Sequence, residues 1–294
     1  MASRSRPRSY VPAPDARIRA LRAGFRVAGA VAPGLAARWA EAIFCTPPRQ
    51  EERPAEETFL ATGRPLSIPY GTAALRGWEW GEGPLVVLAH GWGSRAGRWS
   101  ALVPELLGAG LRVVAYDAPA HGQSPGRLAS LPEFARALRA VAATAGTVHG
   151  LVGHSLGGAA VAVALSQGMP AARAVLIAAP ADPATFSRAF ASYLRIPAPV
   201  RDAMQRNLEA RLQITWDALH LPTIVRHIAA PALVVHDRDD GDVPFDEATA
   251  IAGAWPRAEL MLTEGLGHRA VIRDPTIIAR TVEFLAGGEG PRGR

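Results

Sequence analysis

The stretch VHGLVGHSLGGAAVAVALS, residues 148–166, indicates the fold class of this 294-residue chain. It opens with an apolar run of strand length, Val148 to Val152, and closes with an alanine-rich run of helical length. Between them, Gly153-His154-Ser155-Leu156-Gly157 places a serine on a sharp turn, where the glycines leave room for the chain to reverse. By residue frequency this pattern arises by accident about one time in eight. Its position between a strand and a helix is therefore the more informative observation.

Alternation of strand-length and helix-length apolar segments continues on both sides of this stretch. Predicted strands cover Thr58 to Ala61, Ala74 to Trp80, Leu85 to Ala89, Arg112 to Asp117, Val148 to Val152, Ala174 to Ala178, Ala232 to His236 and Leu260 to Thr263. Predicted helices cover Trp99 to Leu107, Pro132 to Ala143, Leu156 to Ser166, Asp246 to Ala254 and Thr276 to Leu285. Such alternation predicts an α/β fold with a mostly parallel sheet flanked by helices, and a ligand site at the carboxyl ends of its strands.

Composition restricts the class of protein further. The chain is 49% hydrophobic and 20% charged, which is typical of a globular protein with a large core. Cys45 is the single cysteine, so an intrachain disulfide and a cysteine-based metal site are excluded, which suits a reducing, cytoplasmic location. The uncharged run Val27 to Ala37 is too short to span a membrane, and no convincing signal-peptide cleavage site follows it.

Positive charge is concentrated at the N-terminus. All 32 basic residues are arginine; residues 1–50 hold nine of them against Asp15 and Glu41, whereas residues 51–294 hold 23 against 24 acidic residues. The net charges are therefore +7 and −1. Because no nucleic-acid-binding signature accompanies the arginines, we expect no nucleic-acid partner.

The N-terminal region, residues 1–52, is predicted to be a basic arm and helical extension. From Ala16 onward, apolar and basic side chains follow separate helical stripes, and a second helical stretch runs through Trp39 to Phe44 after the Pro33-Gly34 interruption. The stripes consist of Ile18, Leu21 and Phe25 and of Arg19, Arg22 and Arg26. Two interpretations stay open: the helix packs on the main domain, or it makes peripheral contact with an acidic membrane surface or a partner.

Residues 53–294 form the predicted main domain, interrupted at about 181–229 by a helical insertion without strand-like runs. Its large apolar side chains recur at Phe186, Phe190, Tyr193, Leu194, Met204, Leu208, Leu212 and Trp216. Because the insertion follows a strand at the carboxyl edge of the sheet, we expect a small helical cap over the site. The aromatic side chains favour a substrate with an apolar group.

A serine nucleophile needs a histidine to take its proton and a carboxylate to orient that histidine. His268 lies in Gly267-His268-Arg269, after the last predicted strand. An acidic loop, His236-Asp237-Arg238-Asp239-Asp240, follows the preceding predicted strand. The order serine, acid, histidine is therefore present, with Asp237, Asp239, Asp240 and Asp242 as candidates for the acid.

These motifs together resemble the α/β-hydrolases, specifically the serine-dependent esterase and lipase-like members. The resemblance covers roughly Ala74 to Leu285 and is carried by Leu88-Ala89-His90-Gly91-Trp92-Gly93, Tyr116-Asp117-Ala118-Pro119-Ala120-His121-Gly122-Gln123-Ser124, Gly153 to Gly157, the loop through Val243-Pro244, and Gly265 to His268.

The resemblance implies a role for each matching residue. Ser155 would be the nucleophile and His268 the general base and then acid, with the backbone N–H groups of Leu156 and Trp92 as the oxyanion hole. The family pattern His-Gly-x-x-Asp-x-x-Val-Pro fits His236, Asp240, Val243 and Pro244, which nominates Asp240 as the acid. Asp237 stands where the family usually has glycine.

The remaining histidines and Asp117 are assigned structural roles. The resemblance makes His90 and His121 architectural, and His154 is expected to pack against or polarise the turn. Asp117 is expected to fix a loop as a hydrogen-bond acceptor. His149, His220 and His227 lack the neighbours of a metal site, and no metal or cofactor is expected.

The sequence thus predicts a serine hydrolase that cleaves a small-molecule carboxylic ester through an acyl-serine intermediate. Two alternative functions are consistent with the same predicted site. One is a ligand-binding protein without turnover, and the other is an acyltransferase or thioesterase that uses the same three residues.

Overall fold

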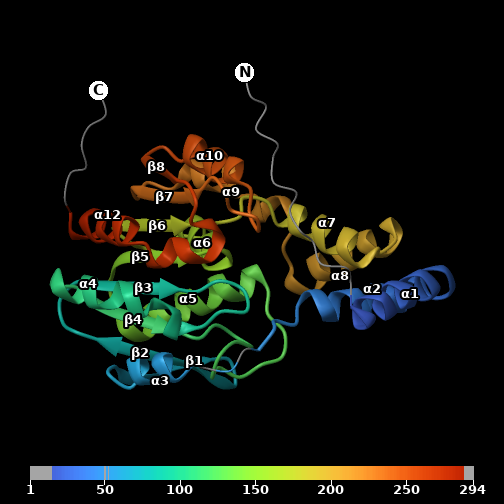
Figure 1. Ribbon diagram of the computed structural model, residues 1–294, viewed down its shortest axis with the longest axis horizontal. Helices are drawn as coiled ribbons and strands as arrows, with labels where there is room; N and C mark the ends of the chain where they lie inside the picture. Colours follow the sequence, from blue (N-terminus) through green and yellow to red (C-terminus); the bar gives the residue numbers. More distant parts are fainter. Residues whose placement is uncertain (1–14, 50, 52, 288–294) are drawn as a thin grey trace. The chain divides into compact units, whose positions relative to one another are not determined.

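The computed structural model describes residues 15–49, 51 and 53–287, and these residues form an eight-stranded sheet in the order β1-β2-β4-β3-β5-β6-β7-β8 (Figure 1). Strands β3 to β8 pair in parallel, whereas β2 runs antiparallel to both β1 and β4. The predicted mostly parallel sheet is therefore confirmed. The strand bounds are β1 Arg64–Tyr70, β2 Ala73–Trp80, β3 Leu85–Ala89, β4 Arg112–Tyr116, β5 Val148–His154, β6 Arg173–Ile177, β7 Ala232–Asp237 and β8 Ala258–Thr263.

Two hydrophobic cores cover the two faces of the sheet. In β3, Val87 and Ala89 belong to the core that contains α5, α6 and α10, while Val86 and Leu88 belong to the core that contains α4 and α12. Successive strand side chains point to opposite faces, so a strand buried on both faces has no polar side. The helices of this part are α3 Pro54–Leu60, α4 Leu102–Gly108, α5 Leu131–Ala145, α6 Leu156–Ser166, α9 Leu221–Ile224, α10 Phe245–Ala254, α11 Gly267–Ala270 and α12 Pro275–Ala286, with short 3-10 helices at Ala96–Ala101, Asp217–Leu219, Val225–His227 and Val271–Arg273.

One predicted strand is wrong and one strand was not predicted. Thr58 to Ala61 belongs largely to helix α3, which begins at Pro54 and carries two glutamates in its first turn. Proline at the first helical position and acidic residues near a helix N-terminus both favour a helix there. The unpredicted strand, β1, contains Pro65 and Pro69, which are tolerated because β1 lies at the edge of the sheet.

The chain divides into two compact units. The smaller unit contains the described residues of the first 44 together with Thr185–Arg211, and the larger contains the rest. Helices α1 Ala16–Val31 and α2 Pro33–Phe44 form the N-terminal part of the smaller unit, and helices α7 Pro183–Leu194 and α8 Ala198–Leu212 supply most of its other part. A boundary at residues 52 and 53 and a cap over the site both stay predictions.

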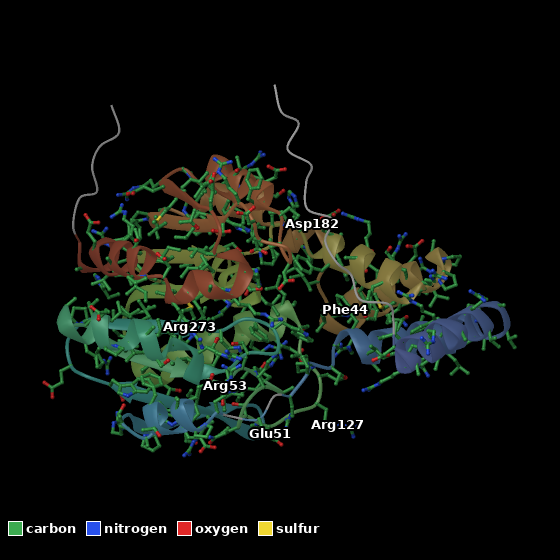
Figure 2. The ribbon with its side chains drawn as sticks, in the orientation of Figure 1. Phe44, Glu51, Arg53, Arg127, Asp182 and Arg273 are labelled. Atoms are coloured by element: carbon green, nitrogen blue, oxygen red, sulfur yellow. The ribbon has the colours of Figure 1, made fainter. Side chains whose placement is uncertain are left out.

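Inside the smaller unit, aromatic contacts join the helices. Phe25 stacks on Trp39 with ring centroids 4.2 Å apart, which holds α1 against α2. Phe44, labelled in Figure 2, makes an edge contact at 5.1 Å with Phe190 of α7. The predicted amphipathic helix from Ala16 is thus present, and its Phe25 side is buried. Across the described residues, no helix has both the length and the apolar character needed to cross a membrane.

Candidate active site

Ser155 lies at the junction of β5 and α6, in a backbone conformation that L-residues rarely adopt. Its φ is +52° and its ψ is −123°, and its N–H donates to the carbonyl of Ile177 on β6 at 2.8 Å. A non-glycine residue held in such a region stores about 1 to 3 kcal/mol of strain, which the surrounding structure has to overcome. The turn therefore holds the serine at the carboxyl edge of the sheet.

Close packing around Ser155 leaves no room for a Cβ at the neighbouring glycines. A Cβ on Gly157 would lie 2.2 Å from the carbonyl oxygen of Ala89, and one on Gly153 would lie 2.4 Å from the carbonyl oxygen of Gly157. A Cβ on Gly91 would lie 3.0 Å from the Cβ of Ser155. The first two contacts are shorter than packed atoms allow, and the third shows that the loop after β3 runs directly against the serine.

His268 and Asp240 are in direct contact. The His268 Nδ1 lies 2.7 Å from Oδ2 of Asp240, whose side chain is fully buried. The other carboxylate oxygen accepts hydrogen bonds from the N–H groups of Asp242 and Val243, each at 2.8 Å. His268 lies in the one-turn helix α11, where the sequence predicted a loop.

His236 provides a further contact to the same carboxylate. Its Nε2 lies 3.3 Å from Oδ2 of Asp240 and 2.9 Å from the carbonyl oxygen of Val243. Because both neighbours are acceptors, we infer that Nε2 carries the proton. Burial alone would raise the pKa of Asp240, but hydrogen bonds from His236, His268 and Val243 outweigh it and lower that pKa. Asp240 is therefore ionised at neutral pH.

Asp237 has a function that the sequence did not reveal. Its buried carboxylate accepts hydrogen bonds from the N–H groups of Leu266 at 3.1 Å and Gly267 at 2.9 Å, and from the Thr263 hydroxyl at 2.8 Å. A fourth bond comes from the N–H of Asp239 at 3.0 Å. Burial raises the pKa of Asp237, but these donors outweigh it and lower the pKa overall. The carboxylate thus holds the chain that leads directly to His268.

Asp239 and Asp242, two other candidates for the acid, are exposed. Asp239 accepts a hydrogen bond from the N–H of Gly265, and neither side chain contacts His268 in the described structure. Among the four acidic candidates, Asp240 is therefore the one that the structure brings to the imidazole.

His154 links the serine turn to His268. Its Nε2 lies 2.8 Å from the carbonyl oxygen of His268, and the two rings have centroids 4.9 Å apart. Since the partner atom is a carbonyl, Nε2 is the donor. Burial and the neighbouring His268 lower the pKa of His154 to about 4, so the ring is neutral at pH 7. His154 orients the backbone of the base and does not lie in the position of a base itself.

Two backbone N–H groups near Ser155, those of Trp92 and Leu156, have no acceptor within the described part of the chain. Leu156 is the first residue of α6, where helical N–H groups are left unpaired. Both groups are thus available to an oxygen atom of a ligand, as the sequence-based assignment requires.

The loops around Trp92 are fixed by buried polar groups. His90 accepts from the N–H of Ala118 at 2.9 Å and donates to the carbonyl of Gly91 at 2.7 Å. Asp117 accepts from the N–H groups of Ala96 and Gln123, each at 2.8 Å, which confirms its predicted role.

His121 packs edge-on against the Trp92 ring at 5.3 Å, and burial lowers its pKa to about 4. Both His90 and His121 are buried and hydrogen-bonded to the backbone of these loops. Their predicted architectural roles agree with this placement.

Among the hydrogen bonds of the described residues, none joins the Ser155 hydroxyl to His268. In ligand-free enzymes such contacts are often long and shorten when substrate binds. His268 lines an open hollow of about 450 Å³ together with Gly241, Asp242, Leu266, Arg269 and Ala270. No group of three or more His, Cys, Asp or Glu side chains within the described ranges is arranged to hold a metal ion.

Comparison with known proteins identifies the family. The sequence profile of the alpha/beta hydrolase family matches residues 86–281, which is more than half of the chain. The chain belongs to the alpha/beta hydrolase family. Its predicted membership and fold are thereby confirmed.

Individual relatives match shorter segments of the chain. A pimeloyl-(acyl-carrier protein) methyl ester esterase of Methylococcus capsulatus is 53% identical over 45 residues, which are 15% of this chain and 17% of the relative. A bifunctional esterase/perhydrolase of Acinetobacter calcoaceticus is 38% identical over 112 residues, covering 34% of this chain and 39% of the relative. The chain thus matches well under half the length of either relative.

Among solved structures, the monoacylglycerol lipase of Paleococcus ferrophilus is similar, with a TM-score of 0.59 at 24% identity. The match covers 73% of this chain and 99% of that lipase. At this level of identity the likeness shows a shared fold only.

Proposed function

We propose that this protein is a serine hydrolase that cleaves a carboxylic ester through an acyl-serine intermediate. The observation that carries the proposal is the arrangement at one edge of the sheet. A strained Ser155 lies beside two unpaired N–H groups, and a histidine is held by an ionised, buried Asp240. The esterase names of the two relatives described above agree with this proposal.

In the first half-reaction, Ser155 attacks the ester carbonyl carbon while His268 Nε2 takes the hydroxyl proton. Asp240 accepts from Nδ1, which leaves the lone pair on Nε2 for this task. The N–H groups of Trp92 and Leu156 donate to the oxyanion, and one such donor is typically worth about 3 to 4 kcal/mol. Collapse of the tetrahedral intermediate breaks the bond to the leaving alcohol, which receives the proton from His268.

In the second half-reaction, water attacks the acyl-serine and gives its proton to His268. The second tetrahedral intermediate expels the Ser155 oxygen, which regains a proton from the imidazole, and the carboxylic acid leaves. His154 and Asp237 hold the backbone of the base from two sides during both steps. The proposal requires the Ser155 hydroxyl and His268 Nε2 to come within hydrogen-bond distance when substrate binds.

We assign the substrate an apolar acyl or alcohol group on the sequence of the segment between β6 and β7, which contains Phe186, Phe190, Tyr193 and Trp216. The test is turnover of p-nitrophenyl esters from acetate to decanoate, with labelling by a fluorophosphonate probe. We expect Ser155→Ala to lose both turnover and label, and Ser166→Ala, at the end of α6, to keep both. Labelling that persists in Ser155→Ala would overturn the assignment.

The acceptor of the acyl group defines the second candidate function. One relative is named an esterase/perhydrolase, and an acyl-serine can pass its acyl group to hydrogen peroxide, an alcohol or a thiol as well as to water. Product analysis with each acceptor separates hydrolysis from transfer. A pocket that binds esters without any labelling at Ser155 would instead support the ligand-binding alternative.

A further inference from the structure

Helix α1 carries two apolar stripes on opposite sides, and only one of them is covered. The covered stripe contains Leu21 and Phe25; Phe25 is fully buried and stacks on Trp39. On the same side, Gly29 lies against Pro197 at the start of the neighbouring helix, where a Cβ would come within 3.0 Å of that ring. This stripe is therefore covered by other residues of the smaller unit.

The second stripe faces solvent. Ala20, Ala23, Val27 and Val31 follow the i, i+3, i+7, i+11 spacing of one helical face, and all four are exposed. Val27 is 64% exposed and Val31 is 80% exposed. After the break at Pro33, Leu35 is 67% exposed at the start of α2. Val27, Val31 and Leu35, here called the hairpin tip, are thus exposed apolar residues on the two sides of the break between α1 and α2.

Charge in this unit is strongly positive. Its described residues, 15–44 and 185–211, carry ten arginines against Asp15, Glu41, Asp202 and Glu209, a net charge of +6. The remaining described residues carry 17 arginines against 20 acidic residues, a net charge of −3. The arginines on α1 border the exposed stripe, with Arg26 on one side and Arg17 on the other.

We propose that α1 and α2 dock the protein reversibly on an anionic phospholipid surface. The hairpin tip would enter the boundary between headgroups and acyl chains, and Arg17 and Arg26 would extend to the lipid phosphates. Self-association is disfavoured because it would bring two units of net charge +6 together. A nucleic acid would bind the arginines, but nucleic-acid binding would not explain the exposed apolar stripe.

The proposal is tested with the full-length protein by co-sedimentation with vesicles. We expect binding to phosphatidylcholine vesicles that contain phosphatidylglycerol, weak binding to phosphatidylcholine alone, and loss of binding as ionic strength rises. Val31→Asp should weaken binding at least about tenfold, because it replaces an inserted aliphatic group by a charge. Arg26→Glu changes the charge by two, and at about fivefold for each charge should weaken binding about 25-fold.

Matched controls lie on the larger unit. Leu128→Asp replaces an exposed aliphatic residue, and Arg257→Glu reverses an exposed charge; neither should change binding by more than about twofold to threefold. Because all four positions are exposed, circular dichroism should show unchanged folding.

Equal binding to both kinds of vesicle, or unchanged binding of Val31→Asp and Arg26→Glu, would overturn the proposal. So would a dimer in sedimentation velocity that Val31→Asp dissociates, since the stripe would then bind a second copy. The readout is binding, so the outcome does not depend on the proposed ester hydrolysis.

Discussion

Removal of the Asp237 carboxylate should affect catalysis more than substrate binding, because this group holds the chain segment that carries His268. Asp237 is fully buried and accepts four hydrogen bonds, from Asp239, Thr263, Leu266 and Gly267. Hydrogen bonds to a charged group contribute about 1.5 to 3 kcal/mol each, and they do not add fully. Asp237→Ala should therefore lower the free energy of unfolding by about 3 to 5 kcal/mol, and Asp237→Asn by about half as much.

The kinetic effect follows from the position of Gly267, whose N–H donates to Asp237 and which directly precedes His268. A displacement of the base by about 1 Å can cost up to about 100-fold in rate. We expect kcat for a p-nitrophenyl ester to fall about 10- to 100-fold in Asp237→Ala, with KM changed by about twofold or less. The kcat of Asp237→Asn should lie between that of Asp237→Ala and that of wild type.

The assay combines urea unfolding, steady-state kinetics and the rate of fluorophosphonate labelling. Asp239→Ala is the matched control, because this exposed neighbour accepts one hydrogen bond in the same loop and its loss should cost less than about 1 kcal/mol. If Asp237→Ala is folded, less stable, and yet turns over substrate at the wild-type kcat, then Asp237 supports the fold without positioning His268, and the reasoning fails.

The lowered pKa of Asp237 adds a pH dependence to the same prediction. A carboxyl group whose folded-state pKa is depressed stabilises the protein above its unfolded pKa of about 3.9 and loses that effect as pH falls through the folded value. The difference in stability between wild type and Asp237→Asn should therefore be constant near neutral pH and narrow below about pH 4.

Three further predictions concern other residues of the site. Asp240→Asn should leave the protein folded but lower kcat about 10³- to 10⁴-fold, because the amide no longer fixes the His268 tautomer; a fall under tenfold would contradict this. Gly157→Ala should give little folded protein in a thermal scan, since its Cβ would lie 2.2 Å from the carbonyl oxygen of Ala89; a wild-type melting temperature would refute the steric argument. The pKa of buried His121 is lowered to about 4 from an unfolded value of about 6.5, so the unfolded state binds the proton first and stability falls as pH drops between these values. His121→Asn should reduce that slope by about 1.4 kcal/mol per pH unit in urea titrations at several pH values, and an unchanged slope would exclude this histidine as its source.

Much of the parallel sheet could be predicted from the sequence, because strands such as β3 and β6 are buried on both faces and so consist almost entirely of apolar residues. The helix α3 was mistaken for a strand because Thr58 to Ala61 is an apolar run too short to reveal its period. The strand β1 was missed because Pro65 and Pro69 argue against a strand unless its position at the edge is known.

The candidate site was predictable where chemistry depends on side-chain type. Ser155, Asp240 and His268 were assigned by order and motif, and the structure places the last two in contact. The role of Asp237 was not predictable, because its partners are mostly backbone N–H groups, which leave no mark in the sequence. The one available signal was a carboxylate where the family pattern has glycine.

The bond between His154 and the carbonyl of His268 joins the end of β5 to α11, the short helix after β8, although β6 and β7 lie between β5 and β8 in the sheet. A loop exchange with another family member would keep this connection only if the new segment placed its backbone carbonyl at the same point, opposite the donor of His154. Engineering of substrate preference should therefore transplant the segment from Asp237 to His268 as one block and keep His154 in the recipient.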